Sequence, residues 1–222
     1  MPALAALTSS SPSHEGVDTG FARFRTMWWS MWPISGVPPL PPSVAAYQRV
    51  AADLIAGGII DDASTLYWDV RPSNRYPTLE FRAADNCTDI DDAVLHAGLV
   101  RSLVRTLARG LERDALRYRM RRSLRRGGSP RATGFGGLFD PVSGAFMPAA
   151  LVIRRVVAQL EPDLREHGEF DSISRMVARV LNRGTSADLQ RAQFAAGRDL
   201  RQVVQCLVRA TRCWGSDAWP AA

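Results

Sequence analysis

Lysine is absent from this 222-residue sequence, so all 28 of its basic residues are arginine. They outnumber the 22 acidic residues and give a formal net charge of +6. Because the bias runs through the whole chain, it is typical of genome-wide codon composition and not of selection at one site. A nucleic-acid-binding protein concentrates its basic residues on one element. The net charge therefore does not indicate a nucleic-acid partner, and we expect no specific one.

Cysteine and histidine are also scarce. The cysteines include no CxxC pair, and their odd number favours a reduced cytosol over a disulfide framework: Cys87, Cys206 and Cys213. The histidines are scattered and show no metal-ligand spacing: His14, His96 and His167. No apolar run approaches the roughly 20 residues that a membrane span needs, and the N-terminal segment lacks the basic start of a signal peptide. We expect a cytoplasmic protein with no membrane partner.

Helical patterns dominate the chain after its first third. Hydrophobic residues make up 46% of the sequence, which is enough to build a core. The strongest pattern starts at Thr88 or Asp89 and extends to about Arg122, with apolar residues three or four positions apart. Residues 1–8 indicate a short apolar helix, and residues 125–147 indicate a loop. Further helices are predicted at 44–56 with Ser43 as N-cap and Gly57 at its end, at 151–160 after Pro148, at 171–182 between Asp171 and Gly184, and after Ser186 and Asp199.

Two strands are predicted near residue 70, over 66–71 and 78–83, with a turn between them. Side chains alternate between the two faces of a strand. If the strands pair antiparallel, their apolar faces coincide, and the opposite face carries Asp69, Arg71, Glu80 and Arg82. Carboxylate oxygens suit Mg²⁺ and the guanidinium fork suits phosphate. The alternative is an ordinary half-exposed sheet whose polar face holds cross-strand ion pairs.

The same two segments carry a resemblance to a known family. The run from Leu66 to Ser73 ends in Arg-Pro-Ser, and the run from Thr78 to Asp85 has the form T-x-E-x-R-x-x-D. Other segments match in the same order: Ser10-Ser11-Pro12, Asp18-Thr19-Gly20, Phe24-Arg25-Thr26, Trp32-Pro33, Asp140-Pro141 with Gly144, Gly184-Thr185-Ser186-Ala187 and Gln190-Arg191. Together they resemble the C-terminal part of the glutamate–cysteine ligase type 2 family of carboxylate–amine ligases.

The resemblance implies an α+β fold. We expect a partial glutamine-synthetase-like catalytic fold, with an antiparallel hairpin or sheet in the N-terminal half backed by several helices. It also implies one truncated catalytic domain over 1–222, with an aromatic-rich segment and the site hairpin in 1–86 and a mainly helical part in 87–222.

The implied activity is ATP-dependent ligation. A substrate carboxylate, typically the γ-carboxylate of glutamate, attacks the γ-phosphate of Mg-ATP, and the amine of cysteine or a similar amino acid then attacks the acyl phosphate. Positioning and charge neutralisation dominate such phosphoryl transfer. ATP and Mg²⁺ are the expected cofactors.

The resemblance assigns roles to single residues. Glu80 is expected to bind the metal, and Arg82 is expected to contact ATP phosphate. Arg71 is expected to hold phosphate or the substrate carboxylate, and Arg25 is a weaker candidate for ligand binding. Asp69 and Asp85 are expected to orient these arginines.

The chain departs from the family pattern at its start. The family opens with a glutamate-rich strand and later has a His-x-His strand, and neither occurs here. We therefore expect Met1 to be an internal start of a longer frame, with weak or absent activity alone. Unpaired sheet edges favour association, so we expect a homodimer or a complementary N-terminal half.

Two other interpretations stay open. The chain is alternatively a non-catalytic remnant that acts as a binding or dimerisation module. An arginine run over 117–126 is either a nucleic-acid patch or, as we favour, a solvated helix end and loop.

Overall fold

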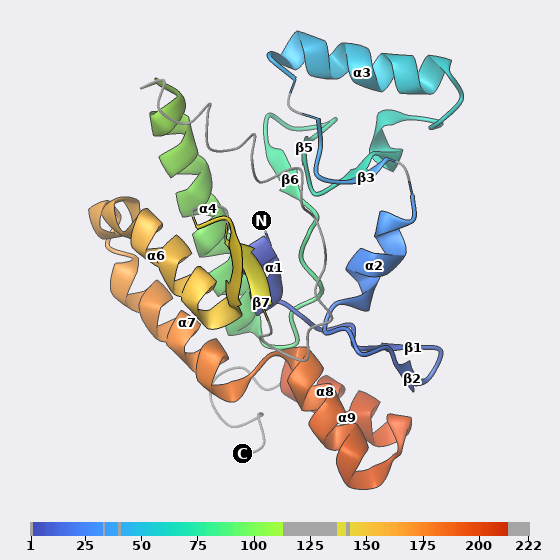
Figure 1. The fold of residues 1–222 in the computed structure, drawn as a ribbon, viewed down its shortest axis with the longest axis vertical. Helices are drawn as coiled ribbons and strands as arrows, with labels where there is room; N and C mark the ends of the chain where they lie inside the picture. Colours follow the sequence, from blue (N-terminus) through green and yellow to red (C-terminus); the bar gives the residue numbers. More distant parts are fainter. Residues whose placement is uncertain (1, 33, 40, 113–136, 141–142, 213–222) are drawn as a thin grey trace. The chain divides into compact units, whose positions relative to one another are not determined.

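The computed structural model describes residues 2–32, 34–39, 41–112, 137–140 and 143–212. They divide into two compact units (Figure 1), a helical unit of Met1–Phe24 with Ala84–Ala222 and a smaller unit of Arg25–Ala83. The smaller unit contains both predicted strands. The single catalytic domain stays a prediction, and the arginine run over 117–126 lies outside the described residues.

Four helices share the main core of the helical unit: α1 (Pro2–Leu7), α4 (Ile90–Glu112), α6 (Ala149–Glu166) and α7 (Phe170–Arg183). Their apolar stripes face one another, as helices of this amphipathic kind require. In Figure 1, α6 and α7 run side by side next to α4. Side chains buried deep in this core include Leu4, Leu95, Leu99, Leu160 and Leu164. The helices predicted in these regions are confirmed, while the predicted extension of α4 to Arg122 lies outside the described residues.

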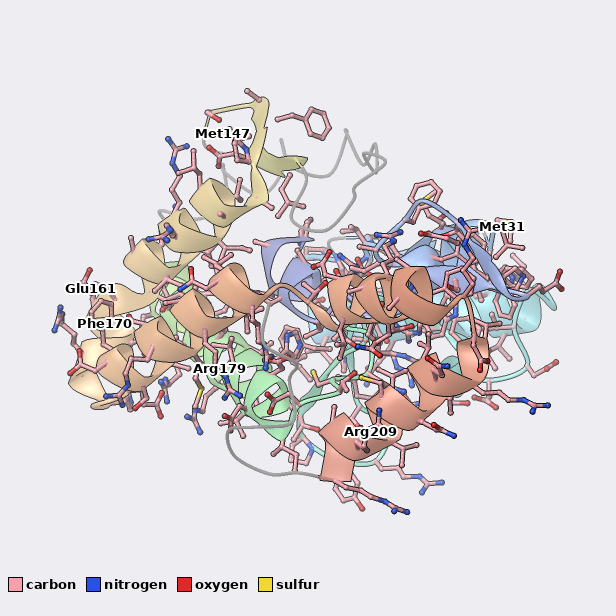
Figure 2. All side chains as sticks on the ribbon, turned by 90° about the horizontal axis from the view of Figure 1, so that it is seen from below. Met31, Met147, Glu161, Phe170, Arg179 and Arg209 are labelled. Carbon is pink, nitrogen blue, oxygen red and sulfur yellow. The ribbon has the colours of Figure 1, made fainter. Side chains whose placement is uncertain are left out.

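Ion pairs join these helices around the core. Nε of Arg105 on α4 donates a bifurcated hydrogen bond to both oxygens of the buried Asp163 carboxylate on α6, and Nη2 donates to one of them, at 2.8–3.1 Å. Arg183 of α7 pairs with Asp89 and Asp92 at the start of α4. Figure 2 shows Glu161 and Phe170 at one end of the α6–α7 pair, where Arg165 joins them through an ion pair and a cation–π contact.

Two helix starts differ from the prediction by one or two residues. Asp171 lies in the first turn of α7, and Glu169 occupies the N-cap position. Thr185, not Ser186, caps α8 (Ser186–Gly197) through a capping box with Asp188. A side chain caps a helix only where its backbone is still outside the helix, and Ser186 is already inside it.

The loop predicted over residues 125–147 is wrong at its C-terminal end. Strands β7 (Gly137–Asp140) and β8 (Ala145–Pro148) form an antiparallel hairpin. Gly144 takes φ of 71° in the turn, and its amide donates to the Asp140 carbonyl at 2.8 Å. Asp140 and Gly144 belong to the segments that carry the family resemblance, and both contribute to this turn. The glycine and proline residues indicated the turn correctly, but the strands beside it are too short to show a pattern of their own.

Helix α8 contacts two of the N-terminal segments that carry the family resemblance. Strands β1 (Ser13–His14) and β2 (Val17–Asp18) form a small antiparallel hairpin. Arg191 of α8 donates to both carboxylate oxygens of Asp18, at 2.9 and 2.8 Å, and Gln190 donates to the Ser10 carbonyl at 2.9 Å. Helix α9 (Leu200–Arg212) follows, and Asp199 accepts from the Arg201 amide at 2.8 Å as predicted.

The smaller unit, Arg25–Ala83, has its own core. Helix α2 (Phe24–Ser30) leads to β3 (Ser35–Gly36) and then to α3 (Val44–Ala56), whose predicted Ser43 cap and Gly57 end are confirmed. A 3₁₀ turn, η1 (Ala63–Thr65), precedes β4 (Tyr67–Trp68), β5 (Val70–Pro72) and β6 (Leu79–Phe81). The core consists of Ala51, Ile60, Leu66 and Trp68.

The first predicted strand of this unit is divided at Asp69. Strand β4 pairs in parallel with β3, and β5 pairs antiparallel with β6. The Asp69 amide donates to the Gly36 carbonyl at 2.6 Å, so the chain changes partner at this residue. The apolar face is also less uniform than predicted, because the Leu79 residue is 48% exposed.

The described residues form helices and small two-stranded ladders, most of them antiparallel. The predicted mixed α+β class is confirmed for them. The glutamine-synthetase-like arrangement stays a prediction. Among the helices that the structure describes, none has the length and hydropathy to cross a membrane.

Candidate functional site

The β5–β6 hairpin brings the predicted site residues together. Its register places Arg71 opposite Glu80. The Ser73 amide donates to the Thr78 carbonyl at 2.9 Å, and the Arg82 amide donates to the Asp69 carbonyl at 2.8 Å. The antiparallel pairing predicted from the sequence is confirmed, and it carries Arg71, Glu80 and Arg82 on one short scaffold.

Arg71 is the most firmly held of these side chains. Its side chain is 7% exposed, and Nε donates to Glu80 Oε2 at 2.8 Å. Nη1 donates to the carbonyls of Ala63 at 2.6 Å and Leu66 at 3.3 Å. A guanidinium has five N–H donors, and protein atoms take up much of this set. Arginine is almost never buried unless it is paired. The sequence does not show the partners of Arg71, so its burial could not be predicted.

Glu80 is the carboxylate partner of Arg71. Its side chain is 37% exposed. The hydrogen bond from Arg71 is the main reason why its pKa lies below the usual value, and burial opposes that effect. Glu80 is therefore ionised at neutral pH, and an ion pair already occupies one of its oxygens.

Arg82 lies beside this pair without an ion pair of its own in the described part of the chain. Its Nη1 makes only long contacts, of 3.5 Å, to the carbonyls of Ser64 and Leu66. Its guanidinium carbon lies 5.3 Å from the ring centre of Tyr67 and 5.7 Å from that of Trp29. Burial and the nearby positive charge of Arg71 lower its pKa, but an arginine stays protonated at neutral pH.

Arg25 completes the group from helix α2. Its guanidinium carbon lies 4.1 Å from the Trp29 ring, one helical turn away, and Nη1 donates to the Arg82 carbonyl at 3.4 Å. Trp29 and Tyr67 were not named as site residues. The spacing of four residues between Arg25 and Trp29 was a readable signal for their contact, whereas the contact of Tyr67 with Arg82 depends on the tertiary fold.

The site has more positive than negative charge near Arg82. Two arginines and one glutamate are among the groups that act on it electrostatically, namely Arg71, Arg25 and Glu80. Where guanidinium groups outnumber carboxylates, they can bind the oxygens of a phosphate or carboxylate ligand. The arrangement can therefore bind an anion.

The fit to a metal ion is poor. In residues 2–112 and 137–212, apart from the undescribed positions, no group of three or more His, Cys, Asp or Glu side chains could hold one. Mg²⁺ prefers several oxygen ligands in octahedral geometry, and Glu80 is a single carboxylate paired with Arg71. These residues do not form a Mg²⁺ site by themselves, so Glu80 as a metal ligand stays a prediction.

Asp69 and Asp85 contact different parts of the chain. The Asp69 backbone supports the hairpin, as described above. Asp85 belongs to the helical unit and is buried, and its Oδ2 accepts from the Ser10 amide at 3.1 Å and the Ser11 hydroxyl at 2.7 Å. Their role in orienting the arginines stays a prediction.

Comparison with known proteins identifies a family of ligase-type enzymes. The chain belongs to glutamate-cysteine ligase family 2 (GCS2), whose family model matches residues 1–205. The resemblance noted in the sequence is confirmed.

Similar proteins carry the name "Putative glutamate--cysteine ligase 2" or a numbered form of it. One from Salinispora arenicola is 39% identical over 216 residues, covering 96% of this chain and 57% of the relative. One from Frankia alni is 37% identical, covering 96% and 56%. One from Rhodopirellula baltica is 36% identical, covering 95% and 56%. The chain thus spans little more than half the length of these relatives.

Proposed function

We propose that this chain forms the arginine-bearing side of an ATP-dependent carboxylate–amine ligase site that joins glutamate to cysteine or a similar amino acid. The observation that carries the proposal is the β5–β6 hairpin, where Arg82 lies beside the Arg71–Glu80 pair without a carboxylate partner of its own among the described residues. Membership of the ligase family supports the reaction class.

The residues have distinct tasks in this proposal. Arg82 binds an anionic oxygen of the ATP phosphates or of the substrate carboxylate, and Arg25 supports it from α2. Arg71 is buried, so it acts mainly by fixing Glu80 and the hairpin. Positive charge held in place lowers the barrier to phosphoryl transfer because negative charge is spread over the transferring oxygens.

A metal ion has a limited place in the proposal. When bound, Mg²⁺ neutralises charge on the phosphates of ATP. Because the described residues do not form a metal site, Mg²⁺ arrives with the nucleotide in our proposal, and Glu80 is one available oxygen ligand.

The test is ADP release from Mg-ATP with glutamate and cysteine present. We expect slow release that falls about tenfold in Arg82→Gln, since a charge-assisted hydrogen bond contributes about 1.5–3 kcal/mol. Arg75→Gln is the matched control, because Arg75 is an exposed arginine in the turn of the same hairpin. Equal turnover in both variants would eliminate the proposed role of Arg82.

The second candidate is a non-catalytic binding or dimerisation module. It is favoured by one observation, that Arg71 already occupies one oxygen of the Glu80 carboxylate. This candidate predicts no thermal stabilisation by Mg-ATP at any concentration, and a dimer by light scattering. A ligand-dependent rise in the melting temperature that Arg82→Gln abolishes would exclude it.

A further inference from the structure

Two aromatic rings and two weak hydrogen bonds contact the Arg82 guanidinium. Its contacts to the carbonyls of Ser64 and Leu66 are both 3.5 Å long, at the weak limit of a hydrogen bond. Arg71, in contrast, has donor–acceptor distances of 2.8 and 2.6 Å to Glu80 and Ala63. The rings of Tyr67 and Trp29 lie within cation–π range of Arg82.

The two rings are themselves fixed. Trp29 and Tyr67 contact each other edge to face, with ring centres 5.0 Å apart, and Trp32 contacts Tyr67 from 4.8 Å. Edge-to-face packing of this kind stabilises a pair of rings in one geometry. The Ser35 hydroxyl donates to the Trp32 carbonyl at 2.8 Å and also to the Trp29 carbonyl, which holds the end of α2 in place.

Trp29 also contacts a second cation. Arg25 lies 4.1 Å from the Trp29 ring, closer than Arg82. The π-system of one indole therefore attracts two guanidinium groups that would otherwise repel each other. Arg25 also donates to the backbone carbonyl of Arg82, so the ring and this hydrogen bond act on the same two residues.

We propose that Trp29 and Tyr67 are positioning residues, which hold the Arg82 guanidinium in the orientation that binds an anionic oxygen of the ligand. This inference rests on the proposed function for the identity of the ligand, but the positioning itself is a property of the chain. The rings do not touch the ligand in this account; they act through Arg82.

The experiment measures the ordering of Arg82 directly. ¹⁵N relaxation of the Arg82 and Arg25 Nε–Hε groups reports their order parameters in the chain without ligand. We expect high order in the unchanged chain and a clear loss at both arginines in Trp29→Leu. Tyr67→Leu is expected to loosen Arg82 more than Arg25, and Tyr67→Phe, which keeps the ring, is expected to retain the order of both.

Trp32→Leu is the matched control. It removes a tryptophan from the same cluster, and within the described residues Trp32 contacts the Tyr67 ring but stacks on no guanidinium. Arg82 should lose less order in this variant than in Trp29→Leu or Tyr67→Leu. An Arg82 order parameter that is unchanged in Trp29→Leu and Tyr67→Leu, or lowered equally in Trp32→Leu, would overturn the inference.

Binding of inorganic triphosphate, measured by calorimetry, gives the second readout. Loss of a cation–π contact should weaken binding about 2- to 30-fold in Trp29→Leu. Tyr67→Phe should bind like the unchanged chain, and Trp32→Leu should lose less affinity than Trp29→Leu. Equal affinity in Trp29→Leu and the unchanged chain contradicts positioning. The proposed function fails in a different way, through absence of triphosphate and Mg-ATP binding by the unchanged chain, and the order parameters then still decide the inference.

Discussion

The Arg105–Asp163 ion pair makes a sharp prediction about the stability of the helical unit. Asp163 is 3% exposed and receives three hydrogen bonds from Arg105, whose side chain is 24% exposed. Arg105→Gln leaves this carboxylate buried without its main partner. Removing one member of a buried pair costs about 3–5 kcal/mol, and we expect the lower end, because Arg109 Nη1 remains 3.9 Å from Asp163.

Urea denaturation followed by circular dichroism measures this loss. Arg101→Gln is the control, because Arg101 lies one turn earlier on α4 and pairs with Glu169 from a 59% exposed position. An exposed pair contributes at most about 1 kcal/mol. Equal free energies of unfolding for the two variants would refute the reasoning that burial decides the cost.

The pH dependence of the same variant has a definite sign. Burial is the largest single influence and raises the pKa of Asp163, but the hydrogen bonds and charge of Arg105, together with smaller effects of neighbouring groups, hold the pKa below its usual value. A carboxylate with a lowered pKa stabilises the folded state above its unfolded pKa, and the stabilisation disappears as pH falls through the folded pKa. The difference between Arg105→Gln and the unchanged chain should therefore shrink below about pH 4. A difference that grows with acid would contradict this assignment.

Two further variants test local features. Gly184→Ala should destabilise the chain by about 1–2 kcal/mol, because Gly184 has φ of 87° and an added Cβ would lie 3.1 Å from Asp188. Chemical denaturation measures this loss. Gly144→Ala is the comparison, because φ there is 71° but the space around the added Cβ is open. Ser43→Ala should cost about 1 kcal/mol, because the Ser43 hydroxyl accepts from the Ala46 amide at 3.2 Å, while Ser43→Asp should retain the cap in the same measurement. A melting temperature unchanged in Ser43→Ala would show that this cap is not needed.

Local signals predicted the ends of several helices and the pairing of the site hairpin. Ser43, Pro148 and Gly184 mark helix ends because capping and backbone geometry depend on a few neighbouring residues. The alternation of apolar and polar residues around a short turn predicted that Arg71 and Glu80 share one face, and the structure places them opposite each other. These features need no knowledge of distant contacts.

Features that depend on distant residues could not be predicted. Strand β4 pairs with β3, which is about 30 residues earlier and has no strand pattern of its own. Burial of Arg71 depends on the carbonyls of Ala63 and Leu66, and the contact of Arg82 with Trp29 depends on the place of α2. Contacts with backbone carbonyls and ring faces produce no periodic pattern in the sequence, so their contribution to the site can be seen only in the structure.

Calorimetric titration of the unchanged chain with Mg-ATP, repeated on Arg82→Gln and Arg75→Gln, tests the central claim most directly. The account predicts saturable binding that weakens about tenfold or more when Arg82 is replaced and stays the same when Arg75 is replaced. Heats that show no binding, or an identical loss of affinity in both variants, would contradict an anion site built on this hairpin.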